Sequence, residues 1–386
     1  MSGQLLNIPT STQTVSVSVI NTTATIKGID TWKFFEPPIK GHEWLAAPCY
    51  SFLIEHKDAS GATRRLVFDL GIRKDWQNLS PFLIKRFETN GYAVDVKQSV
   101  REILESNDIS CAGDQIEALI WSHWHFDHTG NPSEFPSATE LIVGPGFKEK
   151  LLPGYPTNAE SAILESDYTG RTLEEVDFSQ SGVRVGQFAA VDYFGDGSFF
   201  LLDSPGHAVG HICGLARVTS EPASFVFMGG DIAHHAGEWR PSPHLPLPEQ
   251  IKPHPFHDEP QASTPFCPGS LFENLGQSRS SGGSRTETFY KPAKLETGQI
   301  HHDIDQTIAS IEKMQELDGI KDESIMMCVA HDETLLGVID FFPKTVNDFV
   351  QKDWVGRLRW KFLRDFASAV DHEIPGKQSW APVTKS

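Results

Sequence analysis

The sequence predicts a mixed α/β fold with two β-sheets, and the order of its apolar patterns supports this. Strand patterns and helix patterns alternate in both halves of the chain. In the first half, strands are expected at 14–28, 51–55, 65–70 and 116–121, with helices at 80–89 and 97–106. A second series of short strands is expected at 140–144, 187–193, 198–203, 211–217 and 224–229. The close spacing of this second series indicates a second sheet.

Turn signals and helical spacing justify the individual elements. Valines alternate with Ser and Thr from Val15 to Val19, and the turn-like residues 21–23 predict that this strand passes into another one. Residues 59–62 are expected to form the turn between the strands at 51–55 and 65–70. Apolar residues at helical spacing predict a helix over 303–317, followed by a strand over 324–329 and a last helical stretch over 344–371.

Composition excludes several classes of function. Lysine and arginine total 33 against 51 acidic residues, a formal charge of −18, and no basic block offers a surface for nucleic acid. A neutral or weakly charged small molecule is the better substrate. The five cysteines are scattered without a CxxC pair, which suits reduced thiols in the cytoplasm. The first charged residue is Lys27, and no apolar run reaches the length of a membrane helix, so we expect neither a secretory signal nor a membrane anchor.

A cluster of metal-ligand residues follows the predicted strand at 116–121. The segment SHWHFDHTG, residues 122–130, contains His123, His125, Asp127 and His128. Imidazoles and carboxylates are the ligands that borderline divalent metals prefer, and this spacing lets one pair face one ion and the second pair another. A run of solvated histidines is the alternative explanation. Further ligand candidates end or follow other apolar strands, namely His207, Asp231 and His331.

These segments together resemble the metallo-β-lactamase superfamily, and in particular its lactonase-like branch. The resemblance runs from about Ser51 to His331 and rests on the strand ending in Asp69, SHWHFDHTG, SPGHAVGH at 204–211, GGD at 229–231 and AHD at 330–332. It implies a four-layer αββα sandwich. We therefore expect a single domain over 1–386, with a Pro-, Gly- and Ser-rich insertion at about 240–300 and a C-terminal helical segment at 344–372.

The resemblance also implies the roles of the ligand candidates and two Zn²⁺ ions per chain. One metal would be held by His123, His125 and His207, and the other by Asp127, His128 and His331. Asp231 would bridge the two ions, and Asp69 would orient the site without being a ligand. A homodimer is a possibility that the class leaves open.

The expected reaction is hydrolysis of a small lactone or lactam ring. Two metals would share a hydroxide that attacks the carbonyl carbon, and Asp127 would pass a proton to the leaving group. Lactonases of this kind carry a tyrosine three residues after the bridging aspartate, whereas this chain has His234. We expect His234 or its neighbour His235 to replace that donor, the alternative being that both are surface residues. A thioesterase and an iron-dependent oxidoreductase are the other activities considered.

Other aromatic and sulfur-containing residues near the motifs are expected to have simpler roles. Trp124 and Phe126 between the ligands are interpreted as apolar support for their loop, with lining of the substrate pocket as the alternative. Cys213 is not needed to complete either metal. The histidines of the insertion are interpreted as bystanders, although they lie where they could cover the pocket: His244, His254 and His257.

Overall fold

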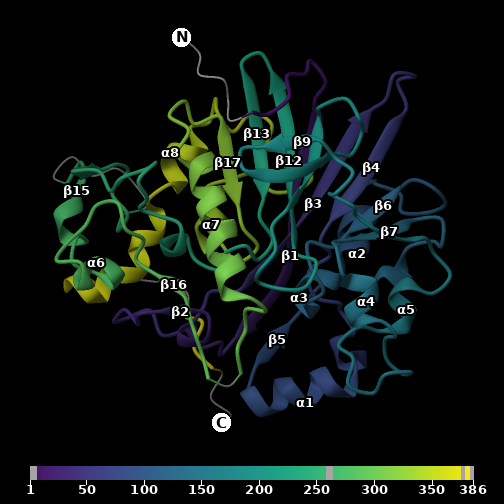
Figure 1. The fold of residues 1–386 in the computed structure, drawn as a ribbon, viewed down its shortest axis with the longest axis horizontal. Helices are drawn as coiled ribbons and strands as arrows, with labels where there is room; N and C mark the ends of the chain where they lie inside the picture. The colour runs from purple at the N-terminus through teal and green to yellow at the C-terminus, as the bar shows by residue number, and fades with distance from the viewer. Residues whose placement is uncertain (1–6, 258–263, 297, 375–378, 383–386) are drawn as a thin grey trace.

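The computed structural model describes residues 7–257, 264–296, 298–374 and 379–382 (Figure 1). A seven-stranded sheet has the order β5-β1-β3-β4-β6-β7-β8. Its strands are β1 (Val15–Lys27), β3 (Pro48–Lys57), β4 (Thr63–Phe68), β5 (Ala93–Asp95), β6 (Ala118–Ile120), β7 (Glu140–Val143) and β8 (Leu173–Glu175). A six-stranded sheet has the order β17-β13-β12-β11-β10-β9. Its strands are β9 (Val183–Val185), β10 (Phe188–Asp192), β11 (Phe199–Asp203), β12 (Ile212–Ser220), β13 (Ala223–Met228) and β17 (Ile325–Cys328).

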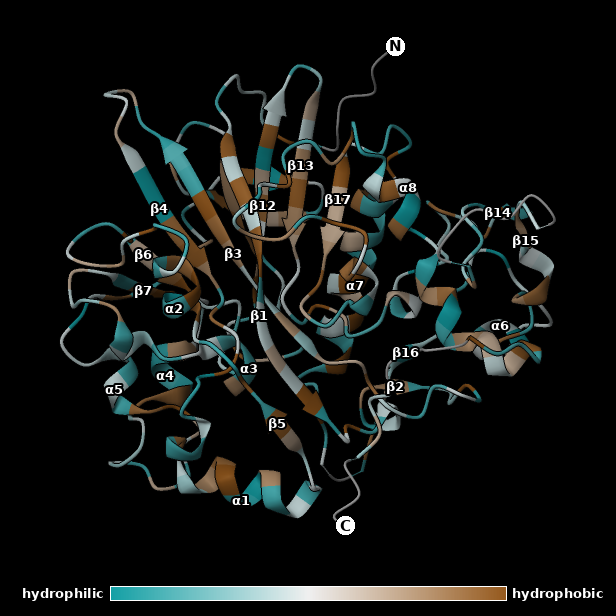
Figure 2. Ribbon diagram, turned by 180° about the vertical axis from the view of Figure 1, so that it is seen from behind, coloured by the Kyte–Doolittle hydropathy of each residue, from teal (hydrophilic) through white to brown (hydrophobic). Residues whose placement is uncertain are grey.

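The two sheets pack face to face with helices outside each of them. Side chains from both sheets meet in one core, with Phe52 and Phe68 on one side and Phe199 and Met228 on the other. The outer face of the first sheet is covered by α2 (Val100–Glu105) and α4 (Phe147–Leu151), and that of the second sheet by α7 (Ile304–Asp318). Figure 2 shows the hydrophobic colouring concentrated along the central strands. The expected αββα order of layers is confirmed.

Strand β12 illustrates why both sheets are buried on both faces. Its residues alternate between the two cores, because Ile212 and Ala216 face the other sheet whereas Cys213 and Leu215 face α7. Alternation of this kind gives a continuous apolar run instead of a polar and apolar alternation. Nearly all of β12 is accordingly buried.

Two expectations about the strands are wrong. Residues 21–23 do not turn the chain, since β1 continues as one strand to Lys27 and only shifts its register against β3 between Asn21 and Thr25. Thr23, within this irregular stretch, has a left-handed backbone conformation with a φ of 60°. The strand at 140–144 is β7, which pairs in parallel with β6 and therefore belongs to the first sheet. Hydrophobicity alone does not say which neighbour a short buried strand has.

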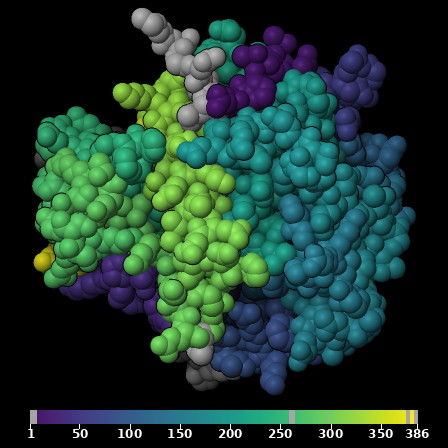
Figure 3. All heavy atoms as spheres, in the orientation of Figure 1, coloured from purple at the N-terminus to yellow at the C-terminus, as the bar shows by residue number. Residues whose placement is uncertain are grey.

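The segment from about 240 to 300 forms a lobe beside α7, shown in green in Figure 3. Within its described residues it contains β14 (Gln250–Ile251), β15 (Cys267–Pro268), α6 (Gly276–Ser280) and β16 (Lys291–Pro292), and β16 pairs with β2 (Phe35–Glu36). Buried side chains such as Phe272 and Tyr290 attach the lobe to the main core. Residues 258–263 and 297 of the expected insertion lie outside the described part of the chain.

The C-terminal stretch is not one continuous helix. Turns lead into α8 (Trp354–Leu358), and a 3-10 helix (Lys361–Val370) follows. Trp354 packs into the core between the sheets, whereas Phe362 and Phe366 pack outside the second sheet. The remaining short helices are α1 (Pro81–Asn90), α3 (Phe126–Thr129) and α5 (Glu165–Tyr168). In the described residues, no helix combines the length and the apolar character needed to cross a bilayer.

Candidate metal centre

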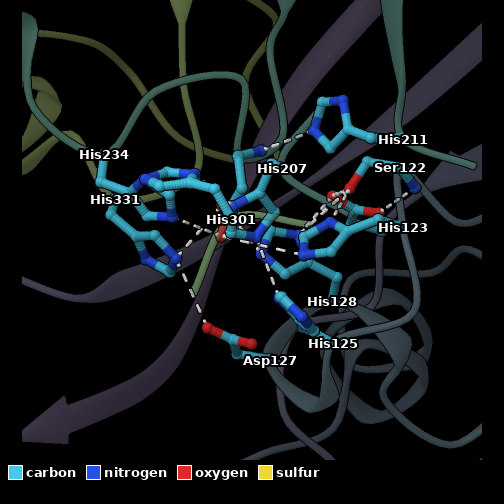
Figure 4. Close-up of polar contacts among 12 residues, drawn as sticks. Ser122, His123, His125, Asp127, His128, His207, His211, His234, His301 and His331 are labelled. Carbon is cyan, nitrogen blue, oxygen red and sulfur yellow. Dashed lines mark hydrogen bonds and ion pairs between the residues drawn. The ribbon is translucent and has the colours of Figure 1, made fainter. Parts of the chain in front are cut away.

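The loops that carry the predicted ligands meet at one edge of the two sheets. Strands β13 and β17 are parallel, and β11 runs in the same direction because β12 is antiparallel to both β11 and β13. Their carboxyl ends therefore share an edge, where they deliver His207, Asp231 and His331. The loop after β6 brings the histidines of residues 122–130 to the same place, as Figure 4 shows. All the predicted ligands are thus brought together.

The loop after β6 is held in shape by backbone contacts. Leu70 N–H donates to the carbonyl of His128 at 2.8 Å, and the Trp121 indole donates to the carbonyl of Thr129 at 3.1 Å. The loop ends at Gly130, where a Cβ would lie 2.3 Å from that of Leu70. Only glycine fits so close to the end of the neighbouring strand.

One group of donor atoms is formed by His123, His125, His207 and Asp231, with one atom from each residue lying within 4.8 Å of the others. Nε2 of His207 lies 2.9 Å from Nδ1 of His125. It also lies 3.5 Å from Oδ2 of Asp231, and Nε2 of His123 lies 3.8 Å from the same oxygen. Three imidazoles and a carboxylate at these separations match the donor set of a tetrahedral zinc site.

A second group is formed by His128, His331 and the other oxygen of Asp231. Nε2 of His128 and Nε2 of His331 lie 3.1 and 3.3 Å from Oδ1 of Asp231. Asp127 joins them, since its Oδ2 lies 3.4 Å from Nε2 of His331. Because Asp231 presents Oδ2 to the first group and Oδ1 to the second, its geometry is that of a carboxylate between two neighbouring ions.

Hydrogen bonds on the outer side of the histidines orient their inner nitrogens. Nδ1 of His128 lies 2.8 Å from Oδ2 of Asp69, and Nδ1 of His331 lies 2.9 Å from the carbonyl of Pro48. Each Nδ1 therefore donates a hydrogen bond outward, which leaves Nε2 as the ring nitrogen directed at Asp231 and available to a metal once it has lost its own proton. Asp69 also accepts from the backbone and hydroxyl of Ser122 at 2.7 and 2.8 Å. This matches the orienting role expected for Asp69.

Two further histidines support the centre, and neither was singled out from the sequence. His301 donates from Nε2 to the carbonyl of Phe34 at 2.9 Å, so its Nδ1 accepts from Nδ1 of His207 at 3.4 Å. His211 accepts the backbone N–H of Asp231 at 3.0 Å. The segment SPGHAVGH offered a signal for His211, four residues after His207. His301 follows an irregular stretch and offered none.

The inner atoms of the centre lack ordinary partners. Nε2 of His123, Nε2 of His128 and Oδ1 of Asp231 are buried and make no hydrogen bond of suitable geometry among the described residues, although the last two atoms lie 3.1 Å apart. Leaving buried polar atoms unpaired costs about 1–3 kcal/mol each, so such atoms gathered in one place indicate a ligand-binding site. Neutral imidazoles and carboxylates are the donors that zinc and related divalent cations take. The residues present fit a metal centre.

Electrostatics divide the histidines into two kinds. Burial and neighbouring histidines hold the pKa of His123 and of His207 well below the usual value. Burial also lowers the pKa of His331, but the carboxylates of Asp231 and Asp127 outweigh it and raise the pKa to about 10. Burial likewise lowers the pKa of His128, but Asp231 and Asp69 outweigh it and raise this pKa well above its usual value. A cation that binds here must displace these protons, so metal binding releases protons.

A cavity of about 270 Å³ opens beside the centre. His125, Asp127 and His331 form part of its wall. Most of the remaining lining is apolar and includes Ile26, Ile29, Phe34, Leu45, Leu83, Phe87, Trp124 and Phe126. Trp124 and Phe126 thus line the pocket, and Phe126 also packs on Phe87 with the ring centres 4.4 Å apart. A small apolar molecule can lie against the metal ligands here.

His234 and His235 are not among the described residues that line this cavity. His234 is 1% exposed, and its Nε2 lies 3.1 Å from Oδ2 of Asp231. The described lining of the cavity does not include it; it borders a smaller space behind the centre, together with His235 and His331. His235 accepts the N–H of Gly237 and lies 3.2 Å from Asp365. Neither is a surface residue, and His234 reaches the centre through Asp231.

The histidines of the insertion and Cys213 lie outside the metal centre and its cavity. His254 and His257 line a separate surface pocket, and His244 packs against Gly319. Cys213 contacts the hydroxyl of Ser204 at 3.1 Å and belongs to no candidate metal group among the described residues. None of these four residues is part of the described lining of the main cavity.

Comparison with known proteins assigns the family. A model of the metallo-beta-lactamase superfamily matches residues 46–257, which carry most of the ligands just described. The chain belongs to the metallo-beta-lactamase superfamily. This confirms the resemblance seen in the motifs and makes the chain a hydrolase of that superfamily. The family match ends before His331, whose place in the centre comes from the structure.

Similar proteins include two curated relatives and a solved structure. The chain is 41% identical over 380 residues to gamma-lactamase FDB1 of Fusarium pseudograminearum (strain CS3096), covering 97% of this chain and 88% of that protein. It is 37% identical over 372 residues to cytochrome P450 monooxygenase mpaDE of Penicillium roqueforti (strain FM164), covering 95% of this chain but only 39% of that longer protein.

The solved structure is a quorum-quenching N-acyl homoserine lactone hydrolase with a TM-score of 0.51 and 15% identity, covering 87% of this chain and 99% of that one. At this identity the likeness concerns the fold. The matching sandwich confirms the expected metallo-β-lactamase fold.

Proposed function

We propose that this chain opens a small lactam or lactone ring by hydrolysis, with two zinc ions held in the centre described above. The observation that carries the proposal is the set of buried, unpartnered nitrogen and oxygen atoms of His123, His128 and Asp231 beside an apolar cavity. The 41% identity to a protein named gamma-lactamase supports a cyclic amide as substrate.

The proposed ligands follow the two groups of donor atoms. The first ion would be held by His123, His125 and His207, the second by Asp127, His128 and His331, with Asp231 shared between them. Zinc bound in this way supplies Lewis acidity, which polarises a carbonyl and makes water a stronger nucleophile at neutral pH.

The residues of the chain position the substrate and move the proton. The small volume and the apolar wall from Leu83, Phe87 and Trp124 suit a neutral ring of modest size and exclude bulk water from it. Asp127 lines the cavity, so it is placed to pass a proton to the nitrogen or oxygen that leaves when the ring opens. We propose that His234 acts on Asp231, 3.1 Å from its Nε2, in place of the substrate-donor role expected from the sequence.

The test is a comparison of metal-loaded and metal-stripped protein on a panel of lactams, lactones and thioesters. We expect two zinc ions per chain, ring opening that stops on chelation and returns with zinc, and little thioester cleavage. His125→Ala should lose turnover and metal, whereas His257→Ala, outside the cavity, should keep both. Full activity of the stripped protein would contradict the proposal, and about two bound iron ions with a visible chromophore would favour an oxidoreductase instead.

We further propose that the enzyme works in the cytoplasm. All five cysteines are free and buried, which is expected of a chain that folds under reducing conditions. Fractionation of cells that express the tagged chain tests this, and recovery in the secreted or membrane fraction would contradict it.

A further inference from the structure

A cysteine lies beside the second group of metal ligands. Cys49 is near the start of β3, and its side chain is buried. Its Sγ, a carboxylate oxygen of Asp127 and a ring nitrogen of His331 all lie within 4.8 Å of one another. The preceding residue contributes the Pro48 carbonyl that orients His331. The start of β3 therefore contacts the second ligand group through both its backbone and a side chain.

The group formed by Cys49 and the group formed by His128 meet at one residue, His331. Both contain His331, and Asp127 and Asp231 both lie within 3.5 Å of its Nε2. In the group that contains His128, Nε2 of His128 and Oδ1 of Asp231 are buried and make no hydrogen bond among the described residues, although they lie 3.1 Å apart. These atoms indicate independently of the cysteine that a ligand is held here.

We propose that the Cys49 thiolate is a further ligand of the second metal position, together with Asp127 and His331. The inference rests on the metal centre proposed above. The thiol would lose its proton to solvent as the S–metal bond forms, because the thiolate is the ligating form. A zinc–sulfur bond of about 2.3 Å beside nitrogen and oxygen bonds of about 2.0–2.2 Å is compatible with donor atoms gathered this closely.

The position of Cys49 also explains how a further ligand leaves the site open to substrate. Asp127, Asp231 and His331 line the cavity, whereas Cys49 is not part of its described lining. The sulfur would reach the ion from the β3 side and leave the cavity side free. A soft thiolate also makes the second position more selective for zinc over magnesium or manganese than oxygen and nitrogen ligands alone.

A measurement on the unaltered protein tests this first. The protein is loaded with two zinc ions per chain and studied by X-ray absorption at the zinc edge. The spectrum should show a sulfur shell at about 2.3 Å with an average of about half a sulfur per zinc, because only one of the two ions has a sulfur ligand. A shell of nitrogen and oxygen alone, with two zinc ions bound, would overturn the role of Cys49 and leave the proposed hydrolase intact. Failure of the chain to bind metal at all would overturn both.

A matched pair of variants gives the second test. Cys213 is equally buried but lies outside the candidate metal groups of the described residues, so Cys213→Ala is the control for Cys49→Ala. With cobalt in place of zinc, we expect a thiolate-to-cobalt charge-transfer band in wild type and Cys213→Ala, and its loss in Cys49→Ala. The Kd for the second metal equivalent should rise at least about tenfold in Cys49→Ala only. An unchanged band and Kd in Cys49→Ala would refute the assignment.

Discussion

Replacing Asp69 by asparagine tests whether hydrogen bonds behind the ligands set metal affinity. Asp69 accepts from the backbone of Ser122 through Oδ1, and from the Ser122 hydroxyl and Nδ1 of His128 through Oδ2. In Asp69→Asn the amide oxygen keeps the backbone bond, so the NH₂ group faces His128. Nδ1 of His128 must then accept, and its proton moves to Nε2, the atom directed at the second metal position. Asparagine tolerates the left-handed φ of 58° at this residue, so the backbone need not move.

Loss of such a partner costs about 10–100-fold in metal affinity, or roughly 1.4–2.7 kcal/mol. Competition against a chromophoric chelator should therefore show a weaker second zinc equivalent, with a less affected first one. Asp196→Asn is the control, because Asp196 makes a similar 2.7 Å contact with Nε2 of His56 outside the candidate metal groups of the described residues. Wild-type affinity for both equivalents in Asp69→Asn would refute the reasoning.

Two other substitutions test the fold around the site. Burial raises the pKa of Asp167 to about 7 from 3.8, so the folded chain holds a proton that the unfolded chain releases, and stability falls as pH rises through this window. Between pH 5 and pH 8, wild type should therefore lose about 3 kcal/mol of unfolding free energy relative to Asp167→Asn, as measured by urea titration. If the two proteins instead show parallel pH profiles, the carboxyl of Asp167 is ionised in the folded chain. Gly206 has a φ of 134°, and a Cβ there would lie 2.2 Å from the backbone nitrogen of Thr307, so Gly206→Ala should displace His207 and cost roughly 2–5 kcal/mol together with metal binding. Gly61→Ala, with a φ of 85° and open space around it, is the control that isolates backbone strain, and equal losses in both variants would exclude the clash.

The fold class was predictable because each strand shows one of two local patterns, either an alternation of apolar and polar residues or a continuous apolar run. Strand β1 and the buried run of β6 were recognisable from local pattern, as was α7 from its helical spacing. Errors arose where pairing decided the outcome. The polar residues 21–23 resemble a turn, but pairing of β1 with β3 on one side and β5 on the other keeps the chain extended through a bulge. Pairing with β6 likewise assigns β7 to the first sheet.

The candidate ligands were visible in the sequence because they lie in the segments that follow apolar strands, and side-chain chemistry together with short spacing identifies them. What orients these ligands was not visible. His331 is held by the carbonyl of Pro48, 283 positions away. The hydrogen bonds that run from His207 through His301 end at the carbonyl of Phe34, 267 positions from His301. A backbone carbonyl is the same group in every residue, so composition carries no record of which one accepts a bond.

The sequence by itself determined which atoms can bind a metal and that loops at strand ends present them. Only the tertiary structure decided that His234 faces Asp231 and not the cavity, and that Cys49 lies beside Asp127 and His331. The physical reason is that ligand identity is local chemistry, whereas proximity depends on how two sheets pack face to face and bring loops distant along the chain to one shared edge.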